Sequence, residues 1–114
     1  MDRLVYDGAV RFSMDDRTLA HLQVVVADKL RRRESFAFTW PQTVEEGGGR
    51  VSVWISGSSA LAFTFDHRGP YRMNRLWLEE LARSANSPGG LQLIEEPVED
   101  DPSSADRPAA PEPS

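Results

Sequence analysis

The sequence predicts an α+β domain in which a mostly antiparallel sheet carries two helices on one face. Several stretches alternate large apolar residues with small or polar ones, which is the period of a half-buried strand. Two other stretches repeat apolar residues at spacings of three and four, which is the period of an amphipathic helix. The resulting order, ββαβββαβ, groups hairpin-linked strands together instead of alternating each strand with a helix, so antiparallel pairing is favoured.

The first third of the chain predicts a hairpin followed by a helix. Strands are expected at Leu4–Tyr6 and Val10–Met14, on either side of the tight-turn pair Asp7-Gly8. Asp15 or Asp16 then offers an N-cap for the helix. The apolar stripe of this helix is Leu19, Leu22, Val26 and Leu30, and its C-terminal end carries a basic cluster of Arg31, Arg32 and Arg33.

Three more strands, a second helix and a last strand follow. The three strands are expected at Ser35–Trp40, Val51–Ser56 and Ala60–Asp66, joined by glycine-rich links, and each places its large residues on one face. The helix runs from an Asn74 cap to Asn86, and a Pro-Gly-Gly motif ends it before a final strand at Leu91–Ile94.

The charge of the chain is unevenly distributed. Residues 95–114 hold seven acidic groups and one arginine, a net charge of −6, whereas residues 1–94 carry +1. The same end of the chain is rich in proline and poor in large apolar residues, so residues 97–114 cannot bury enough surface to offset the entropy of ordering. We expect a folded domain over residues 1–96, followed by a disordered acidic tail.

Residue types and patterns that the sequence lacks exclude several classes of protein. The chain has no cysteine, which excludes a disulfide framework and thiolate metal sites. Its longest unbroken apolar run, Val24–Ala27, is far too short for a membrane span or for the core of a signal peptide. We therefore expect a cytoplasmic protein with no membrane contact.

Two segments carry a resemblance to a known family. They are Asp15–Leu22 (DDRTLAHL), which opens the first helix, and Ser84–Leu91 (SANSPGGL), which spans the end of the second helix and the start of the last strand. Together with the strands between them, they resemble a family of small actinobacterial proteins of unknown function. Members of that family often carry the label of ATP-dependent DNA ligase, but the resemblance supplies no catalytic residue.

The residues themselves do not support the ligase label. Nucleotidyl-transfer ligases attack the ATP α-phosphate with a lysine in a K-x-D-G motif, whereas Lys29, the single lysine, is followed by Leu-Arg-Arg. His21 and His67 lack the spacing of metal ligands, and no serine lies in a G-x-S-x-G motif. His21 falls opposite the leucine stripe and is expected on the surface. We expect no catalytic residue, no metal and no cofactor.

One loop is a candidate anion-binding site. Arg68 and Arg72 lie in the loop before the second helix, and Arg75 opens that helix beside its unpaired backbone N–H groups. The alternative is an ordinary surface loop in a protein that uses arginine in place of lysine throughout.

The sheet face that points away from the helices is a candidate contact surface. If the large strand residues point to the helices, the other face carries Trp54 among small polar residues such as Thr39 and Ser52. A tryptophan in such surroundings is typical of a stacking platform or of a protein contact. The alternative is that the N-terminal hairpin or a second copy of the chain covers Trp54.

Two functions from different classes follow. The first is a non-enzymatic interaction domain that binds an unknown protein partner, or itself as a homodimer, through the Trp54 face. The second is a nucleic-acid or nucleotide-binding accessory protein that uses Arg31–Arg33 and the Arg68–Arg75 loop, with the acidic tail as a competitor for that surface. Because the charge of residues 1–94 is only +1, we expect nucleic-acid binding to be weak.

Overall fold

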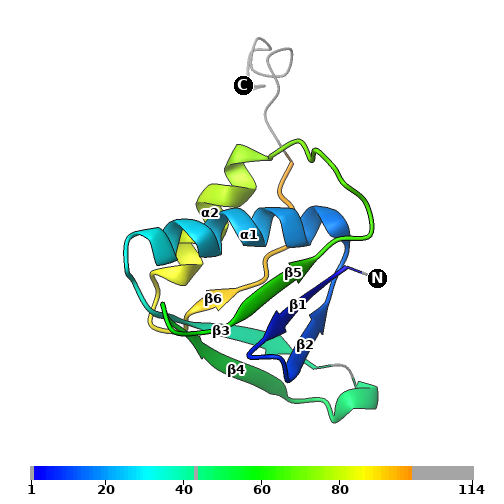
Figure 1. Ribbon diagram of the computed structural model, residues 1–114, viewed down its shortest axis with the longest axis vertical. Helices are drawn as coiled ribbons and strands as arrows, with labels where there is room; N and C mark the ends of the chain where they lie inside the picture. The colour runs from blue at the N-terminus through cyan, green and yellow to red at the C-terminus, as the bar shows by residue number, and fades with distance from the viewer. Residues whose placement is uncertain (1, 43, 99–114) are drawn as a thin grey trace, which may run out of the picture.

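The computed structural model describes residues 2–42 and 44–98. In these residues the helices and strands follow the predicted order ββαβββαβ, with one short 3-10 helix added (Figure 1). The elements are β1 (Arg3–Tyr6), β2 (Val10–Ser13), α1 (Asp16–Arg31), β3 (Phe36–Pro41), η1 (Val44–Glu46), β4 (Arg50–Ile55), β5 (Leu61–Thr64), α2 (Arg75–Ala85) and β6 (Leu91–Gln92).

The strands form two small sheets where we expected one. Sheet A has the strand order β2-β1-β5, and sheet B has the order β4-β3-β6. All strand pairs are antiparallel except β3 with β6, so the prediction of a mostly antiparallel α+β fold is confirmed. Both helices lie on the same side of the strands in Figure 1, as predicted.

The division into two sheets arises at β5. Its position after β4 favours a hairpin between these two strands, but β5 pairs along β1 instead, with Phe63 opposite Leu4. The tip of the first hairpin helps to hold β5 there. The Asp7 carboxylate accepts a hydrogen bond from the Ala60 N–H at 2.8 Å, and the Asp7 N–H donates to the Ala60 carbonyl at 2.7 Å. Two strands that are neighbours in the sequence therefore lie in different sheets.

Local sequence explains how the first hairpin and both helices begin. Asp7 and Gly8 both have positive φ, at 51° and 71°, which is the geometry of the tight turn predicted for this pair. Asp15 is the N-cap of α1, although its side chain makes no capping hydrogen bond. Asn74 caps α2 through its side-chain oxygen, which accepts from the Trp77 backbone N–H at 3.2 Å.

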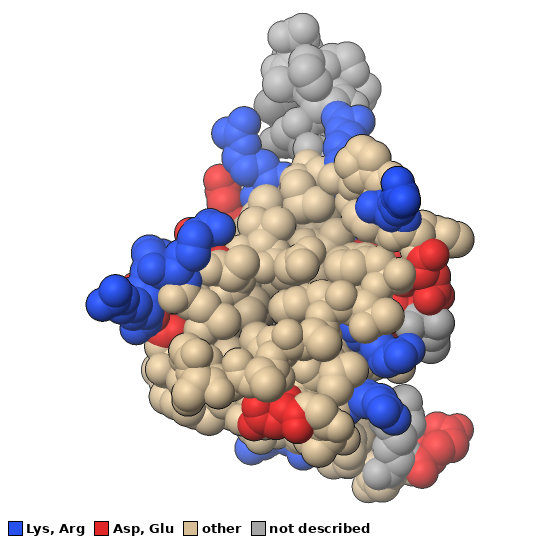
Figure 2. All heavy atoms as spheres, in the orientation of Figure 1, with Lys and Arg blue, Asp and Glu red and all other residues tan. Residues whose placement is uncertain are grey.

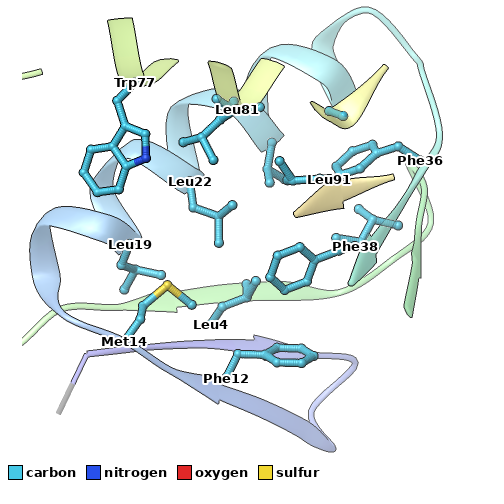
Figure 3. Packing of buried hydrophobic residues seen from close by; sticks show 14 residues of the cluster. Leu4, Phe12, Met14, Leu19, Leu22, Phe36, Phe38, Trp77, Leu81 and Leu91 are labelled. Carbon is cyan, nitrogen blue, oxygen red and sulfur yellow. The ribbon is translucent and has the colours of Figure 1, made fainter. Parts of the chain in front are cut away.

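One hydrophobic core joins both sheets and both helices (Figure 3). Its central side chains are Leu4 and Phe12 of sheet A, Phe38 and Leu91 of sheet B, Leu19 and Leu22 of α1, and Trp77 and Leu81 of α2. The rings of Phe12 and Phe38 meet edge to face with their centroids 5.2 Å apart, so the two sheets contact each other directly.

The buried side of α1 is wider than the predicted stripe. Leu19 and Leu22 are buried as expected, but His21 and Lys29 are buried as well. α2 packs against this additional flank, where the rings of His21 and Trp77 lie 4.4 Å apart. The prediction that His21 lies on the surface is wrong, because α1 is covered by a second helix in addition to the strands.

The approach of β6 to β3 requires a glycine. β6 pairs in parallel with β3, with Leu91 opposite Phe38. Gly90 has a φ of +82°, and a Cβ at this position would lie only 2.6 Å from the carbonyl oxygen of Ala37. A side chain at this position would push β6 away from β3, so the Pro-Gly-Gly motif positions the last strand as well as ending α2.

The predicted disordered tail, residues 97–114, lies outside the described residues apart from Pro97 and Val98. The carbonyl of Pro97 accepts a hydrogen bond from the Asn74 side chain at 2.9 Å. In residues 2–42 and 44–98, neither helix has the length and apolar character needed to cross a membrane.

Candidate functional site

The outer face of sheet B brings together the three residues predicted to form a contact surface. Thr39 of β3 pairs with Ser52 of β4, and Ala37 pairs with Trp54. The hydroxyl oxygens of Thr39 and Ser52 lie 2.9 Å apart and hydrogen-bond to each other. Trp54 is 61% exposed, which is more than any other aromatic side chain in the described residues.

A hollow of about 430 Å³ opens beside Trp54. Among its lining residues are Lys29 and Glu34, whose side chains form an ion pair at 2.8 Å. The hydrogen bond from Lys29 holds the pKa of Glu34 below its usual value, so the Glu34 carboxyl group is ionised at neutral pH. Ala37 and Pro88 supply apolar wall on the side of the indole. The hollow therefore combines a neutralised polar wall with an apolar one.

A second hollow, of about 250 Å³, lies at the other end of the same face. It is lined by Thr39, Pro41, Arg50, Gln92 and Leu93. Along β4, the small side chain of Ser52 separates Arg50 from Trp54. The outer face is therefore a low platform with a guanidinium at one end and an indole at the other.

The N-terminal hairpin holds Trp54 without covering its side chain. Tyr6, the last residue of β1, donates from its hydroxyl to the Trp54 carbonyl at 2.8 Å. This contact fixes the backbone of β4, while the indole remains mostly exposed. The alternative that the N-terminal hairpin covers Trp54 is therefore wrong.

The two arginine groups predicted to bind anions come together only in part. Arg31 and Arg32 of α1 and the neighbouring C-cap, together with Arg75 of α2, line one groove of about 260 Å³ between the helices. Val24 and Leu78 contribute apolar surface to the same groove. Three of the six arginines predicted to bind anions therefore line the same groove.

Acidic neighbours neutralise the arginines at the end of α1. The Asp28 carboxylate lies 2.8 Å from the Arg32 guanidinium and 3.5 Å from that of Arg31. The Glu34 carboxylate also lies near the Arg32 guanidinium, at 3.8 Å. These pairs leave little net positive charge at this end of the groove.

The remaining arginines lie apart from the groove. Arg33 follows the C-cap of α1, and Arg68 and Arg72 lie in the loop before α2. Within the described part of the chain, Arg68, Arg72 and Arg75 make no ion pair. Figure 2 shows Lys and Arg side chains in separate groups around the margin of the molecule, with Asp and Glu side chains between them. No continuous basic face is visible in this view.

A partly buried polar joint connects α1, α2 and the segment after β6, and its members are Arg17, His21, Asn74 and Glu96. The backbone N–H of Asn74 donates to Nε2 of His21 at 2.8 Å. Because Nε2 accepts, the ring hydrogen is on Nδ1, which donates to the Arg17 carbonyl at 2.7 Å. His21 and Asn74 are fully buried. The sequence analysis did not predict this joint.

Glu96 closes the polar joint from the C-terminal side. Its carboxylate accepts two hydrogen bonds from the Arg17 guanidinium, at 2.8 and 2.7 Å, and one from the Asn74 amide at 2.9 Å. The bonds from Arg17, followed by the one from Asn74, lower the pKa of Glu96 to about 2. The Trp77 indole N–H donates to the Ile94 carbonyl at 2.8 Å, so the segment after β6 is fastened across both helices.

The polar joint has residue types found in active sites, but its histidine is closed to a substrate. Both ring nitrogens of His21 are hydrogen-bonded inside the protein, and the ring has no exposed surface. Among residues 2–42 and 44–98, no group of three His, Asp or Glu side chains is arranged to hold a metal ion. The geometry of the joint is that of a structural connection.

Comparison with known proteins assigns the chain to a family. The profile of DUF7882, a domain of unknown function, matches residues 1–96. The chain belongs to this family. No curated protein and no solved structure matches it. The matched range of the DUF7882 domain takes in every helix and strand described above and ends at Glu96 of the polar joint.

Proposed function

We propose that this DUF7882 domain is a cytoplasmic, non-enzymatic protein-interaction domain that binds its partner through the outer face of sheet B. The exposed indole of Trp54 is the observation that carries the proposal. The neighbouring rings on β3, Phe36 and Phe38, are buried, whereas Trp54 leaves most of its side chain in water. A partner that covers the indole would recover about 25 cal/mol for each Å² of apolar surface removed from water.

The surroundings of Trp54 suit a binding hot spot. β3 pairs along the whole of β4, and Tyr6 holds the Trp54 carbonyl, so little backbone freedom remains to be lost on binding. The hollow beside the indole gives partner side chains a place to pack. The partner that fits is a protein that presents an arginine, an aromatic or an aliphatic side chain to the indole.

The environment of Lys29 argues against ligase chemistry, the label carried by members of the actinobacterial family that the sequence resembles. The Lys29 side chain is 7% exposed, and its ammonium donates to Glu34 and Asn86. A nucleophilic lysine must be free to reach a phosphate, whereas the Lys29 nitrogen is buried and hydrogen-bonded to Glu34 and Asn86.

Cross-linking at the contact face tests the proposal. A photo-reactive amino acid in place of Ser52 is activated in cells of the source organism, and the adducts are identified by mass spectrometry. Each partner is then purified, and its dissociation constant is measured with the wild type and with Trp54→Ala. We expect Trp54→Ala to raise the dissociation constant by about tenfold or more, which is the effect of truncating a hot-spot aromatic residue.

Leu76→Ala is the matched control, because Leu76 is also an exposed large apolar residue but lies on α2. It should change the dissociation constant by no more than about twofold, as expected for a residue outside the contact. If Trp54→Ala binds every cross-linked partner as tightly as the wild type does, Trp54 is not the contact residue and the proposal is wrong.

The groove between the helices favours nucleic-acid or nucleotide binding as a second candidate function. Arg31, Arg32 and Arg75 line this groove together, although Asp28 neutralises the first two. Binding to labelled oligonucleotides should therefore be weak and should fall steeply with salt, because each phosphate contact releases condensed counterions. Arg75→Gln should weaken binding, whereas Arg83→Gln, outside the groove, should not. An absence of binding at about 50 mM salt would remove this candidate.

A further inference from the structure

Among the strands of residues 2–42 and 44–98, β4 is an edge strand with no strand paired to its outer side. The Gln42 N–H donates to the Gly49 carbonyl at 2.8 Å. This bond shows which residue pairs of β3 and β4 are hydrogen-bonded to each other. In an antiparallel ladder, hydrogen-bonded pairs alternate with pairs that are not bonded to each other. Counting from this pair, Val51 and Val53 direct their backbone N–H and C=O groups to β3, and Ser52 directs both of its groups outward.

The backbone groups of Arg50 and Trp54 point outward for the same reason. The hydrogen bond from Tyr6 to the Trp54 carbonyl agrees with this phase. In the described part of the chain, the backbone N–H and C=O of Ser52 have no hydrogen-bond partner. A carbonyl oxygen accepts two hydrogen bonds, so the Trp54 carbonyl can still receive another donor. Such a row of outward groups is a template for pairing with another strand.

The side chains along β4 are complementary to those of a second β4. Arg50, Ser52 and Trp54 share the outer face, since alternate residues of a strand lie on one face, and all three are exposed. In an antiparallel pair centred on Ser52, Ser52 lies opposite its own copy, and Arg50 of each chain lies opposite Trp54 of the other. A guanidinium beside an indole gives a favourable cation–π contact, and the twofold axis creates this contact twice.

We propose that two copies of the domain associate by antiparallel pairing of their β4 strands, centred on Ser52. The two copies of sheet B then form one continuous sheet in the order β6-β3-β4-β4-β3-β6. This inference rests on the proposed function, because it names a second copy as the partner of the Trp54 face. Pairing of two β4 strands gives a role to the unpaired edge of β4 and to Arg50. Binding through Trp54 alone would leave both without a role.

Ser52→Pro tests the pairing in the full chain. Proline removes the outward N–H of Ser52 and obstructs the edge, while the hydrogen bonds between β4 and β3 do not use this group. Ser52→Ala is the matched control, because it keeps the N–H. In sedimentation velocity over a concentration series, we expect the wild type to dimerise and Ser52→Ala to weaken the dimer far less than Ser52→Pro does. Ser52→Pro should raise the dimer dissociation constant by about tenfold or more, because it removes central hydrogen bonds.

Hydrogen exchange of the wild type gives a measurement that does not depend on how proline affects folding. The Ser52 amide should exchange about tenfold more slowly at concentrations where the chain is dimeric than after dilution to the monomer. The Val53 amide is the internal control, since its hydrogen bond to β3 is present in both states. Circular dichroism should show that Ser52→Pro keeps its secondary structure.

A chain that stays monomeric up to its solubility limit would overturn the proposal, and so would a dimer in which the Ser52 amide is unprotected. A dimer that is weakened by Trp54→Ala but not by Ser52→Pro would also reject β4 pairing while keeping Trp54 as the contact residue. The proposed function fails by a different result, namely that Trp54→Ala leaves the binding of every partner unchanged.

Discussion

Polar groups are hydrogen-bonded within the protein at the polar joint, whereas on the outer face of sheet B they face water. At the joint, Asn74 is fully buried and its backbone and side-chain groups bond to partners in α1, in α2 and after β6. On sheet B, the backbone of Ser52 and the indole of Trp54 face water. The joint therefore satisfies its polar groups within the domain, whereas the backbone groups of Ser52 have no partner among the described residues.

The largest effect on stability is expected at Asn74. Asn74→Ala removes the N-cap of α2 and the amide that donates to Glu96 and Pro97. It should lower the free energy of unfolding by about 2–3 kcal/mol, measured by urea denaturation, since it combines a lost cap with unpaired buried groups. Asn74→Asp, which keeps the capping oxygen, should retain the cap but lose the two donors. A loss below about 0.5 kcal/mol for Asn74→Ala, typical of a surface site, would contradict a stabilising joint.

A smaller effect, which depends on pH, is expected at Glu96. Its pKa is lowered from 4.5 to about 2 in the folded protein, so its contribution is complete above the unfolded pKa. This contribution is lost as the pH falls from about 5 to about 2, because protonation then removes the charge that Arg17 binds. Since the pair is about one-third exposed, solvent screening reduces the contribution to about 1 kcal/mol.

Comparison of the wild type with Glu96→Gln isolates this contribution. The wild type should be more stable than Glu96→Gln at pH 7, and the difference should shrink toward pH 2 in matched urea titrations. Glu95→Gln serves as the control, because Glu95 is an exposed acid next to Glu96 in the sequence. A difference between wild type and Glu96→Gln that is the same at both pH values would show that the charge of Glu96 does not stabilise the joint.

The smallest effect on stability is expected at Trp54, in spite of the size of its side chain. Trp54→Ala should change the free energy of unfolding by about 0.5 kcal/mol or less, because most of the indole is already in water. The same substitution should weaken association, which is the reverse of the pattern at Asn74. A loss of about 3 kcal/mol or more, as for an aromatic residue of the core, would remove the contrast between the two regions.

The sequence was most informative where structure depends on near neighbours. The alternation along Val51–Ser56 was enough to place Val53 and Trp54 on opposite faces, and the structure confirms that Trp54 is exposed. The turn at Asp7-Gly8 and the cap at Asn74 were predicted for the same reason, because each depends on two to four consecutive residues. The candidate contact surface was therefore predictable from strand period alone.

The polar joint was not predictable in this way, because its members come from three separate segments. The leucine stripe predicts one buried side of α1, and on that basis alone His21 would lie on the surface. In the structure, α2 covers the side of α1 that carries His21. A signal was present: Val25 and Lys29 follow His21 at spacings of four, and this second row is also buried. The pairing of β5 with β1 was missed for a related reason, since local pattern identifies a strand but not its distant partner.

The position of Glu96 in the sequence has a consequence for the kinetics of folding. Its partner Arg17 lies 79 positions away along the chain, so their contact closes one of the longest loops in the domain. Contacts of such high sequence separation tend to form after the transition state, when more local elements have already closed. Substitutions at Glu96 should therefore speed unfolding while leaving the folding rate nearly unchanged in stopped-flow experiments. The ion pair would then determine how long the native state survives, and the first hairpin would contribute more to how quickly it forms.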